Sequence, residues 1–173
     1  MPSWQSIEIK KTIEKDKLDE SVPLSVKRQE WEDYARSLPL PESVTQEAEK
    51  IGDVPCLWVK ADNAFDEYVI VYLHGGGLVE GSAITTREFG ARLTMMTRIP
   101  VLIVDYRLAP EHPYPAALED AQSVYNSLLN GRYQPDQMIF GGDSNGGGLV
   151  LSTLLALRDS ATKLPRCGFL ISP

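Results

Sequence analysis

The chain has 173 residues, of which 43% are hydrophobic and 24% charged, a balance typical of one globular domain with a sizeable core. Its formal net charge of -7 argues against nucleic acid as a partner, since no basic patch stands out. The first residues carry no basic segment followed by an apolar run, and no apolar stretch approaches membrane-spanning length, so a cytoplasmic protein without a membrane span is expected.

The N-terminal part, residues 1–43, is polar and mixed in charge, and we expect it to be helical. Between Ser25 and Ser37, apolar residues recur at roughly helical spacing, which predicts an amphipathic helix that Ser25 caps and that two following prolines stop. A second, frayed helix is expected before it. The aromatic stripe of the predicted helix is interpreted as a packing face, the alternative being part of a lid; it consists of Val26, Trp31, Tyr34 and Leu38.

The remainder, residues 44–173, alternates strand-like and helix-like segments. A hairpin is predicted over 44–51 and 54–60, with Gly52 and Asp53 in its turn. The continuous β-branched and aromatic run 68–73 is typical of a strand buried on both faces of a parallel sheet. The further predicted elements are a helix at 85–97, a strand at 101–105, a helix at 115–129, a strand at 137–140, a helix at 149–158 and a buried strand at 167–171. This alternation predicts an α/β fold with a mostly parallel sheet.

Two side-chain expectations accompany these elements. On the helix over 85–97, Phe89, Leu93 and Met96 are expected to share the packing face. The two cysteines, Cys56 and Cys167, form neither a disulfide framework nor a metal-ligand spacing. They are therefore expected to be reduced, buried thiols.

Residues 142–146 read G-x-S-x-G between a predicted strand and a predicted helix. In that context a sharp turn lifts Ser144 Oγ out of the sheet, where a substrate can reach it. Gly142 and Gly146 allow the turn to be tight, and the following helix N-terminus favours negative charge nearby. The alternative is a glycine-rich turn with a structural role alone.

A nucleophilic serine needs a base, a group that orients the base, and donors for the oxyanion. The run His74-Gly75-Gly76-Gly77 follows a predicted strand, and its glycines expose backbone N–H groups. Such a loop can aim two donors at a developing oxyanion, with the N–H of Asn145 as a third. Three glycines also fit a flexible loop, but the serine motif downstream favours the oxyanion interpretation.

Three blocks resemble the hormone-sensitive-lipase-like branch of the α/β-hydrolases, also called family IV esterases. They are residues 74–77 with Gly81-Ser82, residues 105–111 leading to 113–117, and residues 142–147. The resemblance runs from about residue 24 onward and implies a three-layer α/β-hydrolase sandwich with an N-terminal antiparallel hairpin. It also implies that the C-terminal strands are missing, that residues 1–43 form a cap segment shaping the acyl pocket, and that residues 44–173 form an incomplete core.

The resemblance implies hydrolysis of small acyl esters or lactones through an acyl-enzyme. Ser144 would match the nucleophile, and the N–H groups of Gly75, Gly76 and Asn145 would match the oxyanion donors. The family usually has Ala where this chain has Asn145, which leaves the backbone donor in place but alters the pocket wall.

The middle block, residues 105–117, would be a structural brace in which Arg107 and Glu111 pair and the prolines stiffen the loop. His112 lies in this block, upstream of the serine motif. The order of the triad in this fold therefore argues against His112 as the base, while His74 matches a structural role in the family.

In this fold the triad follows the order Ser, then Asp or Glu, then His. After Ser144 the sequence holds one acid, Asp159, and no histidine. We therefore expect the N-terminal part of an esterase, inactive alone for want of the catalytic histidine. A missing C-terminal segment or a second chain is expected to cover the apolar edge that the last strand, 167–171, would otherwise expose.

Two alternatives stay open. Plant gibberellin receptors resemble the same family and have lost the base, so the first alternative is a non-catalytic protein that binds a small ligand. The second is an inert fragment without a function of its own. No metal is expected, because the acids and the two histidines form no ligand cluster. No nucleotide cofactor is expected, because the glycine motifs lack the Walker lysine and the dinucleotide spacing.

Overall fold

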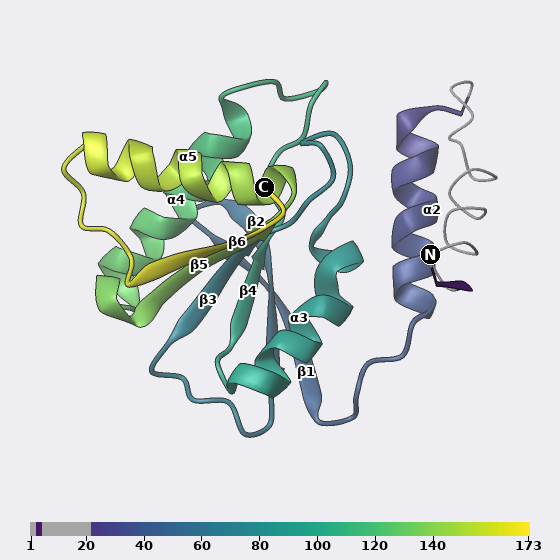
Figure 1. The fold of residues 1–173 in the computed structure, drawn as a ribbon, viewed down its shortest axis with the longest axis horizontal. Coiled ribbons are helices and arrows are strands. Elements are labelled where there is room, and N and C mark those ends of the chain that lie inside the picture. The colour runs from purple at the N-terminus through teal and green to yellow at the C-terminus, as the bar shows by residue number, and fades with distance from the viewer. Residues whose placement is uncertain (1–2, 5–21) are drawn as a thin grey trace.

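The computed structural model describes residues 3–4 and 22–173, which form a sheet with helices on both faces (Figure 1). Within these residues the sheet has six strands in the order β1-β2-β4-β3-β5-β6. The strands are β1 (Val44–Ile51), β2 (Val54–Ala61), β3 (Val69–Leu73), β4 (Val101–Val104), β5 (Met138–Asp143) and β6 (Cys167–Ile171). The hairpin β1–β2 and the β2–β4 pair are antiparallel, while β4, β3, β5 and β6 are parallel. The predicted α/β fold is thereby confirmed.

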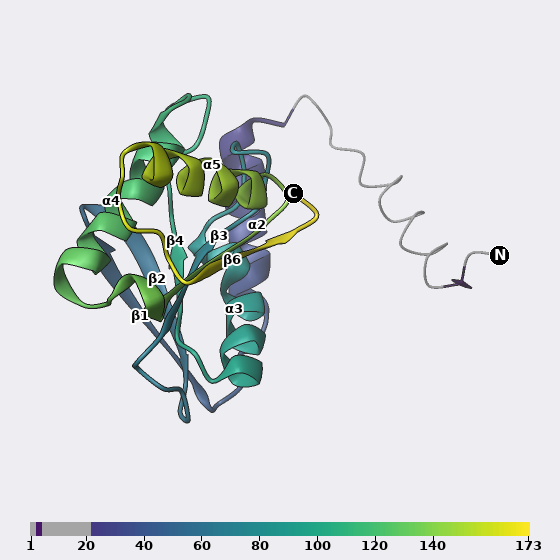
Figure 2. The ribbon, with the colours of Figure 1, turned by 60° about the vertical axis from the view of Figure 1, so that its left-hand side comes forward.

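The helices cover the two faces unequally. They are α2 (Leu24–Ser37), α3 (Ala83–Thr97), α4 (Ala116–Gly131), α5 (Asn145–Asp159) and the short 3₁₀ helix η1 (Pro135–Gln137). Helix α3 covers one face, α4 and α5 cover the other, and α2 packs on the outer side of α3 (Figures 1 and 2). Over the described residues 3–4 and 22–173, no helix combines the length and hydropathy needed to cross a bilayer.

The central strand β3 positions the site. All five of its residues are buried, as their β-branched and aromatic side chains predict for a strand covered by helices on both sides. It lies between β4 and β5 and runs parallel to both. The register pairs Leu73 with Gly142, so the carboxyl ends of β3 and β5 meet at one edge of the sheet. The glycine loop after β3 and Ser144 after β5 therefore leave the sheet side by side.

Helix α2 differs from its prediction at its start and in its exposed face. It begins at Leu24, with Pro23 in the N-cap position and no side-chain cap, so the predicted cap by Ser25 is wrong. The carbonyl of Pro23 instead accepts the first helical N–H bonds. Trp31 and Tyr34 are 51% and 67% exposed, so their stripe is not a buried packing face. The frayed helix expected earlier in the chain lies outside the described residues.

Helix α3 buries small residues, and the predicted apolar stripe holds only in part: Leu93 packs against the core, whereas Phe89 is 37% exposed. Met96 is 85% exposed, so its place on the packing face is wrong. The buried residues of α3 are Ala83, Gly90, Ala91 and Thr94. A Cβ on Gly90 would stand 2.9 Å from Ile103 Cδ1, which shows how closely this helix approaches the sheet. Because α3 lies so close, small side chains occupy the interface.

Strand β6 forms as predicted but is not buried. It is the outer parallel strand of the described sheet, and Leu170 and Ile171 are each 41% exposed. The expected exposed apolar edge is therefore present. Cys167 at its start is exposed, which corrects the expectation of a buried thiol, whereas Cys56 is buried as expected.

Candidate active site

Ser144 lies in a strained turn between β5 and α5. Its φ of 49° and ψ of -131° are unfavourable for a residue with a side chain. The residue is exposed, and its N–H donates to the carbonyl of Ile171 at 2.8 Å. A Cβ on Gly146 would overlap the carbonyl oxygens of Leu73 and His74, so only glycine lets α5 start this close to the end of β3.

Asp143, the residue before Ser144, connects this turn to the glycine loop. Its Oδ1 accepts hydrogen bonds from Tyr72 Oη at 2.9 Å and from the N–H of Gly75 at 3.0 Å. Burial, followed by the bond to Asp143, raises the pKa of Tyr72 above its ordinary value, so the phenol stays protonated and donates. The space beside Gly75 is filled by the same carboxylate, which a Cβ there would overlap.

The glycine loop turns sharply after Gly75. Gly76 and Gly77 have φ values of 122° and 65°, in the region that favours glycine. The carbonyl of Gly76 accepts the N–H groups of Val79 and Glu80 at 3.1 and 2.8 Å. Among the residues that the structure describes, the N–H groups of Gly76 and Gly77 donate to no other group, whereas the N–H of Gly75 is engaged with Asp143.

His74 is built into the core rather than facing the loop's surface. Its ring is 1% exposed and stacks on Tyr106 with ring centroids 4.3 Å apart. Its Nδ1 lies 2.8 Å from the carbonyl oxygen of Gly75, which assigns the proton to Nδ1, and Nε2 has no partner in the described part of the chain. Burial lowers the pKa of His74, so the imidazole is neutral.

The expected pairing of Arg107 with Glu111 is wrong. Arg107 instead binds Asp120, with Nη2 and Oδ1 2.8 Å apart, and Glu119 at 3.1 Å. Glu111 pairs with Arg28 of α2 at 3.0 Å, and the hydrogen bond from Arg28 lowers the pKa of Glu111. The brace is therefore tied at two separate places: Arg107 pairs with two acids of α4, and Glu111 pairs with Arg28 of α2.

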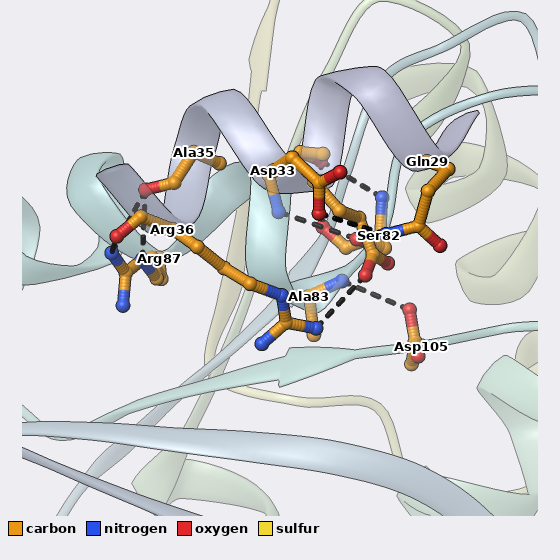
Figure 3. A network of polar contacts seen from close by, with 10 residues as sticks. Gln29, Asp33, Ala35, Arg36, Ser82, Ala83, Arg87 and Asp105 are labelled. Atoms are coloured by element: carbon orange, nitrogen blue, oxygen red, sulfur yellow. Dashed lines mark hydrogen bonds and ion pairs between the residues drawn. The ribbon is translucent and has the colours of Figure 1, made fainter. Parts of the chain in front are cut away.

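A cavity of about 710 Å³ opens beside the glycine loop. Its walls come from α2, α3, the loop and the ends of β5 and β6, and they include Trp31, Tyr34, Leu38, Gly75, Gly76, Phe89, Asp143 and Ile171. The described lining holds one carboxylate and no cationic side chain. Figure 3 shows α2 lying across the start of α3, with Arg87 reaching the carbonyls at the end of α2.

The expected site residues come together without a histidine. Ser144, Asp143, Asn145 and the glycine loop meet at one edge of the sheet, whereas Asp159 sits at the other end of α5 in an ion pair with Arg158. His112 lines a separate hollow of about 300 Å³ that Asn145 also borders. No hydrogen bond to Ser144 Oγ is present among the described residues. Nor do these residues include a group of three or more side chains fit to hold a metal ion.

The link through Asp143 was missed by sequence reasoning. The position before the serine was treated as a variable place in the motif, and Gly75 was assigned to the oxyanion. The sequence alone carries no signal for it, because it depends on the register of neighbouring strands. Because β3 and β5 are parallel neighbours, the residue after Gly142 must face the residues after Leu73.

Comparison with known proteins finds relatives that are named ester hydrolases. The family model of the alpha/beta hydrolase fold matches residues 70–173. An acetyl-hydrolase of Streptomyces hygroscopicus is 38% identical over 123 residues, which are 71% of this chain and 41% of that protein. An esterase of Acinetobacter venetianus is 39% identical over 105 residues, which are 61% of this chain and 35% of that protein.

The fold agrees with solved structures over almost the whole chain. The crystal structure of an esterase from the bacterial hormone-sensitive lipase family superposes with a TM-score of 0.89 at 36% identity. This superposition covers 98% of the present chain and 57% of the crystal structure's chain. By sequence, the matched region spans 41% of the length of the acetyl-hydrolase and 35% of the length of the Acinetobacter esterase.

Proposed function

The chain belongs to the α/β-hydrolase fold family, in its hormone-sensitive-lipase-like branch, and we propose that it carries the nucleophile of a serine carboxylic ester hydrolase. In this proposal Ser144 attacks the ester carbonyl and forms an acyl-enzyme that water then hydrolyses. The observation that supports it most is the exposed, strained position of Ser144 between β5 and α5, beside a loop of unpaired backbone N–H groups.

We infer the oxyanion donors from the backbone N–H groups of the glycine loop and of α5 that have no partner among the described residues. Asn145 opens α5, where a helix leaves its first N–H groups unpaired, and Gly76 has its N–H free as well. We assign these two to the oxyanion, as expected from the sequence. The N–H of Gly75 is engaged with Asp143, so we assign it to holding the loop and add Gly77 as the further donor.

The base must come from elsewhere. A neutral histidine has to accept the proton of Ser144 Oγ and return it to the leaving alkoxide, and an acid has to orient that histidine. His74 is buried in the core, and His112 precedes the nucleophile against the triad order of this fold. We therefore propose that the acid and the histidine are supplied by residues outside these 173.

The cavity limits the substrate. Its exposed aromatic side chains, Trp31 and Tyr34, offer apolar surface that a bound group would cover. A carboxylate on the substrate would meet Asp143, and the described lining offers no cationic side chain to balance it. We propose uncharged acyl esters or lactones as substrates, with residues 1–43 as the cap that shapes the pocket and residues 44–173 as the hydrolase core.

Chemical rescue tests this function on the chain itself. Imidazole added with p-nitrophenyl acetate should stand in for the absent histidine and allow Ser144 to become acetylated. Because imidazole cleaves this ester unaided, the readout is the difference between the chain and Ser144→Ala, together with an acetyl adduct on the peptide that contains Ser144. Ser152→Ala, on the same helix with its Oγ bonded to the carbonyl of Gly148, is the matched control and should behave like the unaltered chain.

The outcomes separate the competing functions. An adduct and a rate excess that vanish only in Ser144→Ala support the esterase. Equal rates and no adduct in all three proteins contradict it. Saturable binding of a small ligand without any adduct would favour the non-catalytic binding protein instead.

A further inference from the structure

Arg28 of α2 makes four hydrogen bonds to segments far from it in sequence. Its Nε donates to the carbonyl of Val79 at 2.7 Å, and its Nη2 donates to the carbonyl of Ala109 at 2.7 Å. Nη1 and Nη2 each donate to one carboxylate oxygen of Glu111 at 3.0 Å. The planar fork of a guanidinium matches this set, because it aims several N–H groups in fixed directions.

The partners of Arg28 belong to the two loops that frame the glycine turn. Val79 lies in the glycine turn, where its N–H donates to the carbonyl of Gly76. Ala109 and Glu111 belong to the proline-rich brace, and the N–H of Ala109 donates to the carbonyl of Leu78 at 2.9 Å. The helix, the glycine turn and the brace therefore meet at one side chain, which is 24% exposed.

The other end of α2 is held in a different way. Arg87 of α3 donates to the carbonyls of Ala35 and Arg36, where the helix ends (Figure 3). It also donates to the carbonyl of Leu38, directly after the helix. This anchor fixes the helix to α3 but involves no residue of the glycine turn. Among the described contacts of α2, those of Arg28 reach that turn.

We propose that Arg28 is a positioning residue that couples the docking of α2 to the geometry of the glycine turn. By holding Val79 it fixes the direction of the Gly76 and Gly77 N–H groups relative to Ser144. The docking of α2 and the orientation of the proposed oxyanion donors in the glycine turn are then set together. The catalytic consequence rests on the proposed function, whereas the effect on the turn rests on the contacts of Arg28 alone.

Hydrogen exchange of the native 173-residue chain tests the coupling. The reporters are the amides of Val79 and Glu80, bonded to the carbonyl of Gly76, and of Ala109, bonded to the carbonyl of Leu78. Arg28→Gln should accelerate their exchange by about tenfold or more, because the turn loses its charge-assisted partner. Arg28→Lys should give a smaller acceleration, since an ammonium keeps attraction for Glu111 but lacks the fork.

Arg36→Gln is the matched control. It removes a guanidinium from the same helix and breaks only a pair with Glu32 one turn away, at 2.9 Å. Its reporter amides should exchange as in the unaltered chain. The proposal is overturned if Arg28→Gln leaves the reporters unchanged, or if the amides of β4 accelerate as much as the reporters do. Equal acceleration in β4 would mean that the substitution lowers the stability of the whole fold rather than loosening the turn.

The rate of imidazole-dependent acetylation of Ser144 supplies the catalytic readout. It should fall several-fold in Arg28→Gln, partly recover in Arg28→Lys, and stay unchanged in Arg36→Gln. If no variant and not even the unaltered chain is acetylated, the proposed esterase function fails while the exchange result still decides the role of Arg28. If exchange changes as expected but acetylation does not, positioning of the donors by Arg28 is contradicted.

Discussion

The carboxylate of Asp143 accepts the N–H of Gly75 at 3.0 Å, so the residue before Ser144 is bonded to the loop that follows β3. The bond runs between the ends of two neighbouring parallel strands. It holds the exposed serine near the N–H groups of the next two glycines, which have no partner among the described residues. Tyr72 stabilises this arrangement, because its hydroxyl donates a second hydrogen bond to the same oxygen of Asp143.

Replacing Tyr72 by Phe should lower the free energy of unfolding by about 1–2 kcal/mol. The change removes one of two donors to Asp143 Oδ1 while keeping the ring that packs 5.1 Å from Phe89. Urea unfolding followed by circular dichroism measures it. Tyr34→Phe, at a side chain that is 67% exposed, should leave the midpoint unchanged. Equal midpoints for both variants would show that the Tyr72 hydroxyl adds no stability.

Two glycines of α5 should respond oppositely to Ala. At Gly146 a Cβ would overlap the backbone carbonyls at the end of β3, so Gly146→Ala should cost about 2 kcal/mol or more. At Gly148 a Cβ meets nothing within 4 Å, so Gly148→Ala should add about 0.5–1 kcal/mol from helix propensity. Thermal unfolding of both variants measures the contrast. A stable Gly146→Ala protein would mean that α5 does not start so close to β3.

The two thiols should differ in reactivity. Cys56 is 4% exposed, and burial raises its pKa to about 12, whereas Cys167 is exposed at the start of β6. A disulfide reagent such as Ellman's should therefore titrate one thiol in the native chain and two in denaturant. Cys167→Ser should abolish the native reaction. Rapid labelling of Cys56 in that variant would contradict its buried position.

Glu49 should contribute to the pH dependence of stability. The hydrogen bond from the Trp58 indole, at 2.6 Å, lowers its pKa below the ordinary 4.5 against opposing burial, and Arg132 lowers it further. A carboxyl whose pKa is lowered on folding stabilises the protein above its unfolded pKa and loses that effect as the pH falls through its folded pKa. Glu49→Gln should therefore lower the urea midpoint near about pH 6, with the difference shrinking toward about pH 3.

The control for this titration is Glu47→Gln, at an exposed residue two positions earlier on β1 that pairs with Trp58 in the strand register. It removes the same charge next to Trp58 but leaves the indole hydrogen bond in place, because that bond goes to Glu49. A pH-dependent difference of equal size in both variants would assign the effect to net charge rather than to the bond with Trp58.

Local sequence patterns predicted the elements well because those patterns are caused by local physics. The apolar run that became β3 and the turn at Gly52 needed no knowledge of distant residues. The pairing of Arg107 with Glu111 failed because ion pairs depend on tertiary placement. Glu111 lies beside Arg28, which is 83 residues away in sequence.

The packing face of α3 was predicted correctly for Leu93 but not for Met96, for a related reason. Spacing of three and four residues predicted an apolar stripe that includes Met96. The helix instead packs closely on the sheet through the side that carries Gly90 and Ala91, because small side chains allow the close approach. At the candidate site, the serine and glycine motifs could be located from sequence. The engagement of the Gly75 N–H could not, since it depends on the register between β3 and β5.

Arg87 holds the end of α2 through hydrogen bonds to the backbone alone. Its three acceptors are main-chain carbonyls of Ala35, Arg36 and Leu38, which every amino acid supplies. Substitutions along the pocket-facing side of this helix therefore leave that attachment intact. The cavity-lining side of α2 can therefore vary while its attachment to α3 stays the same, which makes this helix a suitable place to randomise when a library with altered cavity shape is built.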